Sequence, residues 1–375
     1  MRRVLVISPA GRVYEHDRVQ WYDFPQERIA SEYFNIGDMV VFDSTLKLLQ
    51  YTQVSEMKIR DPSEADIEFY KTFDYIIVRA SNFIHNYMNW ERAIEVLNRV
   101  QIPVYALGVG GQATSRDDYK LTGDNLRFWQ IVSERSKAVG VRGTFTADLL
   151  YANGIRNVDI VGCPSLFRAR NRDLRIEAPA DIKRVAFSVR REVGGGYSSN
   201  PRDYLRIQRD LLLHTMDAFD TTVTTHGEVD EKAFYFQNAQ GMAKARELFL
   251  KEGWWTPETA ERLERLYREK MFFFLRVEDY DRFICSQDFA FGYRVHGVLP
   301  ALANGVPGVL VKYDSRSTEL ADSLSVPSLV IENEPPSDVG KLLREVSFDD
   351  FNKTFALRYD RMKLLIEYNG IPHRM

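Results

Sequence analysis

Short apolar runs that lead into helical patterns recur along this 375-residue chain, and they constrain its fold more than any other feature. In the first part of the chain these runs are residues 3–8, 74–79, 103–109, 138–141 and 158–161. Helical patterns separate several of them, as at 39–50 and 90–100. Apolar runs without alternation are typical of parallel strands covered on both faces. The repeated order of strand and helix therefore predicts a doubly wound α/β domain.

A second set of the same pattern follows a charged, Pro-containing stretch at 171–181, which is the best candidate for a linker. We expect strands at 183–190, 221–225, near Phe283, 308–312 and 328–331, and helices at 204–219, through most of 231–280, after His296 and at 349–368. The predicted divisions are an N-terminal α/β domain at 1–175, a C-terminal α/β domain at 182–348, and a C-terminal helix at 349–375. Ligands bind outside the carboxyl ends of the strands in such folds, so we expect a site in a cleft between the domains.

Composition excludes several classes of protein. Apolar residues make up 45% of the chain and charged residues 27%, as in ordinary globular proteins. A net charge of −3 gives no reason to expect nucleic acid as a partner. The two cysteines, Cys163 and Cys285, exclude a disulfide framework, and no close-spaced His, Asp and Glu set supports a metal site. Since the apolar N-terminal run is too short for a signal peptide, we expect a cytoplasmic protein with at most peripheral membrane contact.

Arg294 and His296 lie two positions apart at the start of an apolar helix that follows an apolar strand. Arginine carries a permanent cation whose fork of donors suits a carboxylate or a phosphate. Histidine is the side chain whose ordinary pKa lies close to neutral pH. Because a helix N-terminus also favours anions, the pair predicts a site that holds an anion and moves a proton. The alternative is an arginine paired to an acid such as Asp288, beside a packed histidine.

Other candidates stand between predicted strands and helices. Gly37 permits a tight turn or the close approach of a ligand, and Asp38 is expected to cap the helix at 39–50. Gly110 belongs to a glycine cluster after a strand, where backbone N–H groups can face a ligand, although a plain turn is the simpler explanation.

Two arginines and a histidine follow strands of the second domain. Arg190 and Arg191 precede a run of glycines at 194–196 and are candidates to clamp a phosphate or a carboxylate; a solvated surface loop is the alternative. His226 ends the strand at 221–225, a position where a histidine is more often structural or exposed. The full set of residues that we expect to bind substrate is Asn35, Gly37, Gly110, Arg190, Arg191, His226 and Lys312.

Over most of its length the sequence resembles the polysaccharide pyruvyl transferases. The motifs that carry the resemblance are short, but their order and spacing make the set fairly specific. They are Gly292-Tyr293-Arg294-Val295-His296-Gly297 with 301–307 and Tyr313-Asp314, Asn35-Ile36-Gly37-Asp38, Val141-Arg142-Gly143 with 161–166, and Ser188-Val189-Arg190. The resemblance implies two Rossmann-like doubly wound domains that face a cleft, an arrangement described as GT-B-like.

The resemblance also implies an enzyme that transfers a pyruvyl unit from phosphoenolpyruvate onto a sugar of a surface polysaccharide or its precursor. The products would be a pyruvate ketal and phosphate, and no cofactor would be needed. The C-terminal domain would bind phosphoenolpyruvate, and the N-terminal domain would bind a glycan or a lipid-linked sugar. His296 would act as general acid, Arg294 and Arg190 would neutralise the donor and the departing phosphate, and Asp38 would activate the sugar hydroxyl.

The chain departs from the family pattern in two places. An aromatic stretch precedes Asn35, and packing within an insertion is favoured over stacking on sugars. Its aromatic residues are Tyr14, Trp21, Tyr22, Phe24, Tyr33 and Phe34. Arg79-Ala80-Ser81-Asn82 stands where the family often has a glycine cluster. Two alternatives stay open: a GT-B glycosyltransferase that uses a nucleotide sugar, and a non-catalytic binding protein on the same fold.

Overall fold

The computed structural model describes residues 2–112, 119–191 and 200–375. Its first half is built on a four-stranded parallel sheet with the strand order β4-β1-β5-β6. The strands are β1 (Arg3–Ile7), β4 (Gln53–Glu56), β5 (Tyr75–Val78) and β6 (Val104–Ala106). The strand order reverses between β1 and β5, so the carboxyl ends of these two strands open a crevice where a ligand can bind.

Helices pack on both faces of this sheet. They are α2 (Ile36–Leu48), α3 (Glu64–Tyr70), α4 (Glu91–Val100), α5 (Gly123–Glu134) and α6 (Thr144–Ala152). Leu5 and Ile7 of β1 enter a hydrophobic core with residues of α3, α4 and α5, whereas Val4 and Val6 enter the core that contains α2. Because successive side chains of a strand point to opposite faces, both faces of β1 are covered, as its unbroken apolar run predicted.

Helix α2 lies between the two halves of the molecule. Eleven of its 13 residues are buried. It contacts α11 (Val277–Ile284) and α12 (Val295–Ala303), which belong to the second half. Most of its buried residues are apolar, as an enclosed helix requires, and the buried Ser44, Thr45 and Asp43 are hydrogen-bonded or ion-paired. Its N-terminus is therefore held against the second half.

The second half contains a six-stranded parallel sheet with the strand order β11-β10-β9-β12-β13-β14. The strands are β9 (Arg184–Ser188), β10 (Asp220–Thr224), β11 (Met271–Phe272), β12 (Phe289–Gly292), β13 (Gly308–Lys312) and β14 (Ser328–Val330). Its further helices are α7 (Pro201–Ala218), α8 (Val229–Tyr235), α9 (Ala239–Glu252), α10 (Ala260–Glu269), α13 (Ser315–Leu324) and α14 (Val339–Arg344). This order is that of a Rossmann fold, with the reversal between β9 and β12, and it confirms the predicted doubly wound α/β class.

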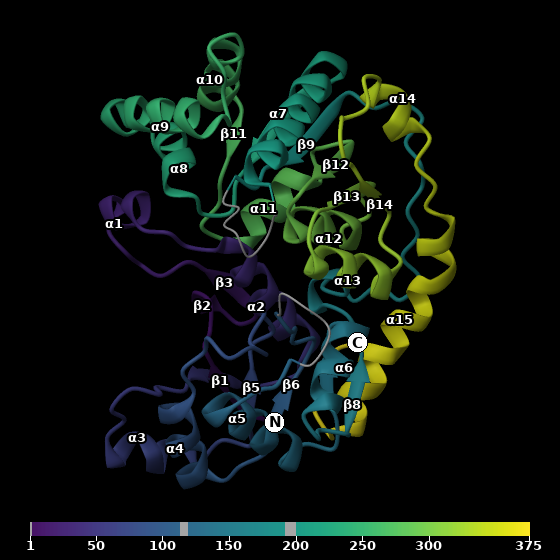
Figure 1. The fold of residues 1–375 in the computed structure, drawn as a ribbon. Helices are drawn as coiled ribbons and strands as arrows, with labels where there is room; N and C mark the ends of the chain where they lie inside the picture. Colours follow the sequence, from purple (N-terminus) through teal and green to yellow (C-terminus); the bar gives the residue numbers. More distant parts are fainter. Residues whose placement is uncertain (1, 113–118, 192–199) are drawn as a thin grey trace.

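The chain returns to its first half at the end. A parallel pair, β7 (Val139–Val141) and β8 (Val158–Ile160), extends the first half beyond β6 through a bridge from Val109 to Val141. The final helix, α15 (Asp349–Tyr368), runs down one side of the molecule (yellow in Figure 1). After it, the side-chain oxygen of Asn369 accepts hydrogen bonds from the backbone N–H groups of Lys137 and Ala138 at 2.9 and 3.2 Å.

The aromatic stretch near the N-terminus forms an antiparallel hairpin, β2 (Arg12–Glu15) and β3 (Arg18–Gln20), followed by α1 (Gln26–Ser31). The ring centroids of Trp21 and Phe34 lie 4.7 Å apart, and those of Tyr22 and Phe24 5.2 Å. The stretch also contacts the second half, because the backbone N–H of Trp21 donates to the Leu275 carbonyl at 2.6 Å. Figure 1 shows α1 beside α8. Packing within the stretch is thus confirmed.

One predicted strand is wrong. Phe283 lies in α11, and the strand comes later, as β12. The buried residues Val277, Tyr280 and Ile284 recur at spacings of three and four, which places them on one face of a helix. Sequence inspection also missed β4 and the two-residue β11, which are too short or too polar to stand out.

Candidate functional site

A pocket of about 110 Å³ lies between the two halves, where the strand order of the second sheet reverses. Arg190 follows β9, and Arg294 follows β12, so both stand at the crevice that these strands open. The predicted residues that line the pocket are Asn35, Asp38, Arg190, His226, Arg294 and His296. The fold therefore brings together side chains from both halves that are far apart in the sequence.

The pocket is built to attract negative charge. Four arginines line it, against two aspartates. Three helices, α2, α12 and α13, begin with residues of the lining, and a helix N-terminus carries a partial positive charge. An anion with more than one charged group fits this arrangement, because donors approach it from several sides.

Arg294 is the N-cap residue of α12 and is held rigidly. Its backbone N–H donates to the Ser188 hydroxyl at 3.1 Å, and its Nε donates to the Val189 carbonyl at 3.1 Å. Its guanidinium also forms an ion pair with Glu228, whose side chain is fully buried. The acid beside Arg294 is thus Glu228 and not Asp288, the acid that the sequence suggested, which pairs with Arg184 at 3.1 Å.

Glu228 was missed by sequence inspection. One of its carboxylate oxygens accepts from the Thr225 hydroxyl at 2.6 Å and from the His226 backbone N–H at 3.0 Å. The other oxygen faces Arg294. Glu228 thereby fixes the direction of the arginine from the loop after β10. Its position two residues after His226 was the only hint in the sequence.

Two histidine rings flank Gly37 in the first turn of α2. A Cβ atom at Gly37 would lie 3.0 Å from Nδ1 of His226 and 3.1 Å from Nδ1 of His296. A side chain at this position would push both rings, so the glycine leaves room for the two histidines. The approach of a ligand to Gly37 stays a prediction, and Gly37 is not among the described lining residues. The His226 carbonyl also accepts from the Ile36 N–H at 2.9 Å, which ties this loop to α2.

Both histidines are neutral near physiological pH. Burial lowers the pKa of His296 to about 4, and the neighbouring Arg142, Arg79 and Arg294 act in the same direction, although Asp38 opposes them. Burial, followed by the charge of Arg294, also holds the pKa of His226 well below its ordinary value. Nε2 of His226 has no hydrogen-bond partner among the residues that the structure describes. An anion in the pocket would favour the charged form of either ring.

Asp38 does not cap α2 as predicted. The N-cap is Asn35, whose side-chain oxygen accepts from the Gly37 N–H at 3.1 Å. Asp38 lies in the first turn, and its carboxylate contacts an arginine and a hydroxyl, Arg79 and Ser81, each at 3.2 Å. These two contacts, and not the free N–H groups of the helix, hold the carboxylate. Asp38 lines the pocket.

Arg142 is a second lining arginine, held by a buried carboxylate and an amide. Its Nε lies 3.3 Å from Glu319, and its Nη2 donates to the side chain of Asn82. Gly110 is not among the described lining residues, but a Cβ there would overlap the Arg142 guanidinium, so the glycine provides the room for it. Arg142 stood in a family motif without an assigned role.

The predicted pair Arg190 and Arg191 divides between two environments. The Arg190 guanidinium stacks over Tyr313, 5.1 Å from the ring centroid, and lines the pocket. Arg191 instead donates to three carboxylates, from Asp230, Glu231 and Glu252, at 2.6–2.7 Å. The glycines at 194–196 lie outside the described residues.

Lys312 ends β13, as predicted, but it too is absent from the described lining residues. Its ammonium lies 3.3 Å from Asp322 on α13. The next residues of the chain, Tyr313 and Asp314, do line the pocket. Asp314 caps α13 by accepting from the Ser317 N–H at 2.8 Å, and it pairs with Arg316 at 2.7 Å. The cation at this edge of the pocket is therefore Arg316, which the sequence did not single out.

A second cavity, of about 200 Å³, lies in the first half at the carboxyl ends of β1 and β4. Its floor is apolar, and Tyr22 and Glu56 supply polar atoms at its wall. Helix α2 borders both cavities, since Asp38 lines the pocket between the halves and Phe42, four residues later, lines this one. Burial raises the pKa of Glu56 above its ordinary value, and Lys58 opposes this.

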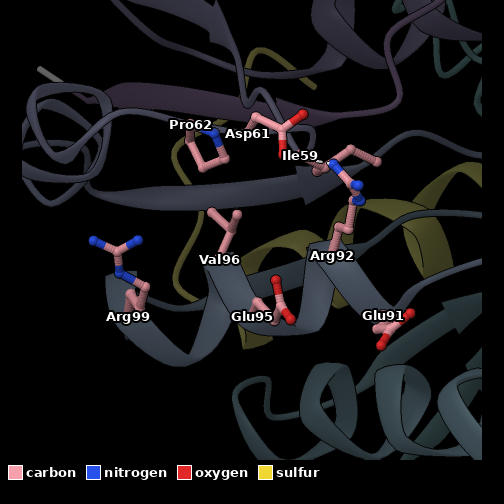
Figure 2. Close-up of a pocket in the computed structure, with 8 residues that line it drawn as sticks. All are labelled: Ile59, Asp61, Pro62, Glu91, Arg92, Glu95, Val96 and Arg99. Carbon is pink, nitrogen blue, oxygen red and sulfur yellow. Dashed lines mark hydrogen bonds and ion pairs between the residues drawn. The ribbon is translucent and has the colours of Figure 1, made fainter.

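A larger hollow of about 640 Å³ lies elsewhere, on the outer side of α4. Figure 2 shows Arg92 and Val96 pointing from this helix toward the segment of Ile59, Asp61 and Pro62. Arg92 pairs with Asp61 at 2.7 Å, and both side chains are exposed. All the predicted substrate-binding and catalytic residues except Arg191 line the pocket between the halves or contact its arginines and helices. None of the predicted residues lines this hollow, so its size does not make it the functional site.

No three His, Cys, Asp or Glu side chains of residues 2–112, 119–191 and 200–375 come together as they would around a metal ion. Within the same ranges, no helix combines the length and the apolar character that a bilayer span requires.

The similarities to known proteins extend over most of the chain. No curated protein gives a significant sequence match. Partial structural likeness extends to the UDP-GlcNAc 2-epimerase from Methanocaldococcus jannaschii, at 11% identity over 97% of this chain and 99% of that chain, with a TM-score of 0.48. It also extends to S. aureus MnaA with UDP, at 12% identity over 98% and 96% of the chains, with a TM-score of 0.47. Likeness of this degree supports no conclusion about substrate.

The family comparison is decisive. The sequence model of the family described as "Polysaccharide pyruvyl transferase" matches residues 35–315, which is more than half of the chain. The matched range contains Asn35 and Asp38 of the first half and Arg190, Arg294 and His296 of the second. The chain is therefore an enzyme that belongs to the polysaccharide pyruvyl transferase family.

Proposed function

We propose that this enzyme transfers a pyruvyl group from phosphoenolpyruvate onto a sugar of a surface polysaccharide or its precursor, forming a pyruvate ketal and releasing phosphate. The observation that carries the proposal is the pocket between the halves, where four arginines and three helix N-termini surround two neutral histidines. Phosphoenolpyruvate carries a carboxylate and a phosphate, so it needs cations from more than one direction.

The reaction can be written with side chains of the pocket. A proton is added to the methylene carbon of phosphoenolpyruvate, which becomes a methyl group and leaves an electron-poor carbon beside the carboxylate. A sugar hydroxyl attacks that carbon, phosphate leaves, and a second hydroxyl of the same sugar closes the ketal. Of the two hydroxyl protons, one balances the proton on the methyl group and the other leaves with phosphate. We assign the first proton to His296 and the activation of the hydroxyl to Asp38.

Proton uptake on donor binding is a direct consequence of this assignment. With a pKa of about 4, the His296 ring is almost entirely uncharged at neutral pH. A bound anion favours the charged ring and raises its pKa. Binding of phosphoenolpyruvate near neutral pH should therefore take up as much as one proton, and affinity should increase as the pH falls toward 5.

Calorimetry in buffers of different ionisation enthalpy measures this uptake. Phosphoenolpyruvate has its own protonation step, so the comparison is with the His296→Gln variant, in which that step is unchanged. The expected result is a smaller uptake in the variant. Equal uptake in both proteins would contradict the role of His296.

Replacement of Arg294 with lysine should lower kcat/KM by about 10²-fold or more, because a point charge replaces a fork that contacts Val189, Glu228 and the pocket together. Steady-state rates of phosphate release measure the loss. The matched control is Arg184→Lys, at the start of β9, where the arginine pairs with Asp288 outside the pocket. Equal rates in the wild type and in Arg294→Lys would refute the assignment.

We place the acceptor sugar in the second cavity. Sugars present apolar C–H faces and hydroxyl groups, which suit the apolar lining residues, Tyr22 and the carboxylate of Glu56. Because α2 contributes Asp38 to the donor pocket and Phe42 to this cavity, an acceptor bound here lies beside the donor pocket.

The Glu56→Gln variant tests this placement. It should raise KM for the acceptor about tenfold, which corresponds to one hydrogen bond to a charged group, and leave KM for phosphoenolpyruvate unchanged. Glu15→Gln, on the exposed part of the hairpin, serves as control. An unchanged acceptor KM would exclude this cavity.

The proposed function itself is tested by incubation with phosphoenolpyruvate and a panel of sugar acceptors. Phosphate release and the methyl signal of the ketal in NMR spectra are the readouts. Calorimetry with phosphoenolpyruvate and with nucleotide sugars separates the alternatives. Absence of phosphoenolpyruvate binding would sink the proposal, and binding of a nucleotide sugar in its place would favour a glycosyltransferase.

A further inference from the structure

A thiol from the first half touches the histidine of the second half. Sγ of Cys163 lies 3.7 Å from Nε2 of His296, and Cys163 is buried. Cys163 is the N-cap residue of the short turn η1 (Pro164–Leu166), so the backbone of that turn fixes its position. The mechanism above makes no use of this thiol.

The contact engages one of the two ring nitrogens. Nε2 is directed at Cys163, whereas Nδ1 lies beside the first turn of α2, 3.1 Å from where a Cβ atom on Gly37 would stand. Proton transfer requires the reacting nitrogen to reach the substrate, so the nitrogen available for it is Nδ1. We infer that Cys163 is a positioning residue that holds Nε2 of His296 and thereby leaves Nδ1 as the nitrogen that exchanges a proton with the substrate.

The surroundings of the thiol explain how it can serve both forms of the ring. Burial raises the pKa of the Cys163 thiol, so it keeps its proton near neutral pH. Its Sγ lies 3.5 Å from the Ser165 hydroxyl as well as 3.7 Å from Nε2. When the ring is neutral, the S–H group donates to Nε2 and the ring proton resides on Nδ1. When the ring is charged, the S–H group turns to Ser165, and sulfur accepts the Nε2–H.

This arrangement accounts for the direction of proton flow. Donor binding takes up one proton from solvent and makes the ring cationic, and the proton on Nδ1 can then pass to the methylene carbon. The neutral ring that remains, with its proton on Nε2, is a short-lived tautomer. A sugar hydroxyl proton restores Nδ1–H, and the Nε2 proton returns to solvent, which regenerates the resting ring. No bond to sulfur is formed or broken, and no oxidant or reductant is required.

The inference rests on the proposed function for the identity of the proton acceptor, but its main test needs no substrate. Nitrogen-15 NMR of the histidine rings distinguishes the two neutral tautomers, and the signal that disappears in His296→Gln identifies His296 among the six histidines. In the wild-type enzyme we expect a single tautomer with the proton on Nδ1. In Cys163→Ala we expect a mixture, and in Cys163→Ser, whose hydroxyl can also donate, a return toward the Nδ1–H form.

Kinetics give the second readout. Cys163→Ala should lower kcat about five- to tenfold, the value of one hydrogen bond, and shift its pH profile, with partial recovery in Cys163→Ser and no change in Cys285→Ala, at the exposed cysteine. An Nε2–H tautomer in the wild type, or the same tautomer in all three proteins, would overturn the inference even if the enzyme proves active. If the proposed function fails, the NMR result still decides whether Cys163 holds the ring.

Discussion

Replacement of His296 with glutamine should lower kcat by about 10²–10⁴-fold, the usual contribution of a positioned general acid or base, while the fold stays intact. The residue lies in the first turn of α12 and lines the pocket, and it is only partly enclosed, so a side chain of similar size can take its place. Phosphate release at saturating donor and acceptor measures the rate, and the midpoint of thermal unfolding reports on the fold.

The matched control for this experiment is His214→Gln. His214 lies on α7, outside the pocket, and its Nδ1 is 3.0 Å from the Pro336 carbonyl. The same chemical change there should leave kcat near the wild-type value. A His296→Gln enzyme with normal turnover would remove His296 from the mechanism. A comparable loss in both variants would point to a general effect on the protein.

Replacement of Arg168 with alanine should lower the free energy of unfolding by about 3–5 kcal/mol, because it breaks a buried ion-pair network. Arg168 pairs at 2.6 Å with Asp43 of α2 and also with Asp281 of α11, so it ties the two halves together. Without it, the buried Asp43 keeps Lys47 as its nearest cation, at 3.2 Å.

Chemical denaturation of the wild type and of Arg168→Ala measures this difference. Arg172→Ala is the control, since Arg172 forms a comparable pair with Asp360 at 2.6 Å but is exposed, where such pairs contribute at most about 1 kcal/mol. Similar losses in the two variants would show that the network between the halves adds no stability beyond a surface pair.

The parts of the fold that the sequence predicted are those with a local cause. The strand at 308–312 and the helix at 349–368 match β13 and α15 in both bounds. Apolar runs and helical periodicity depend only on residues close together in the sequence, so they can be recognised there. The strand expected near Phe283 was wrong, because a short apolar helix and a short buried strand cannot be distinguished from the local sequence alone.

Of the candidate site, too, only the part with a local cause could be predicted from the sequence. The start of α12 at Arg294 and His296 could be expected from the local pattern. Arg190 and Arg191 could not be told apart, because adjacent side chains of an extended segment point in opposite directions and the sequence does not say which one faces a cleft. Glu228 and Cys163 were not assigned roles, since each acts on a residue that only the fold brings near.

The return of the chain to its first half has a consequence for folding during synthesis. The β7–β8 pair emerges from the ribosome long before α15, yet the backbone N–H groups of Lys137 and Ala138 find their acceptor only in Asn369. A Cβ atom at Gly140 would overlap the side chain of Leu365, so the surface of this pair is shaped to receive the late helix. The β7–β8 region, although it is made early, thus completes its packing only after the last helix has been made.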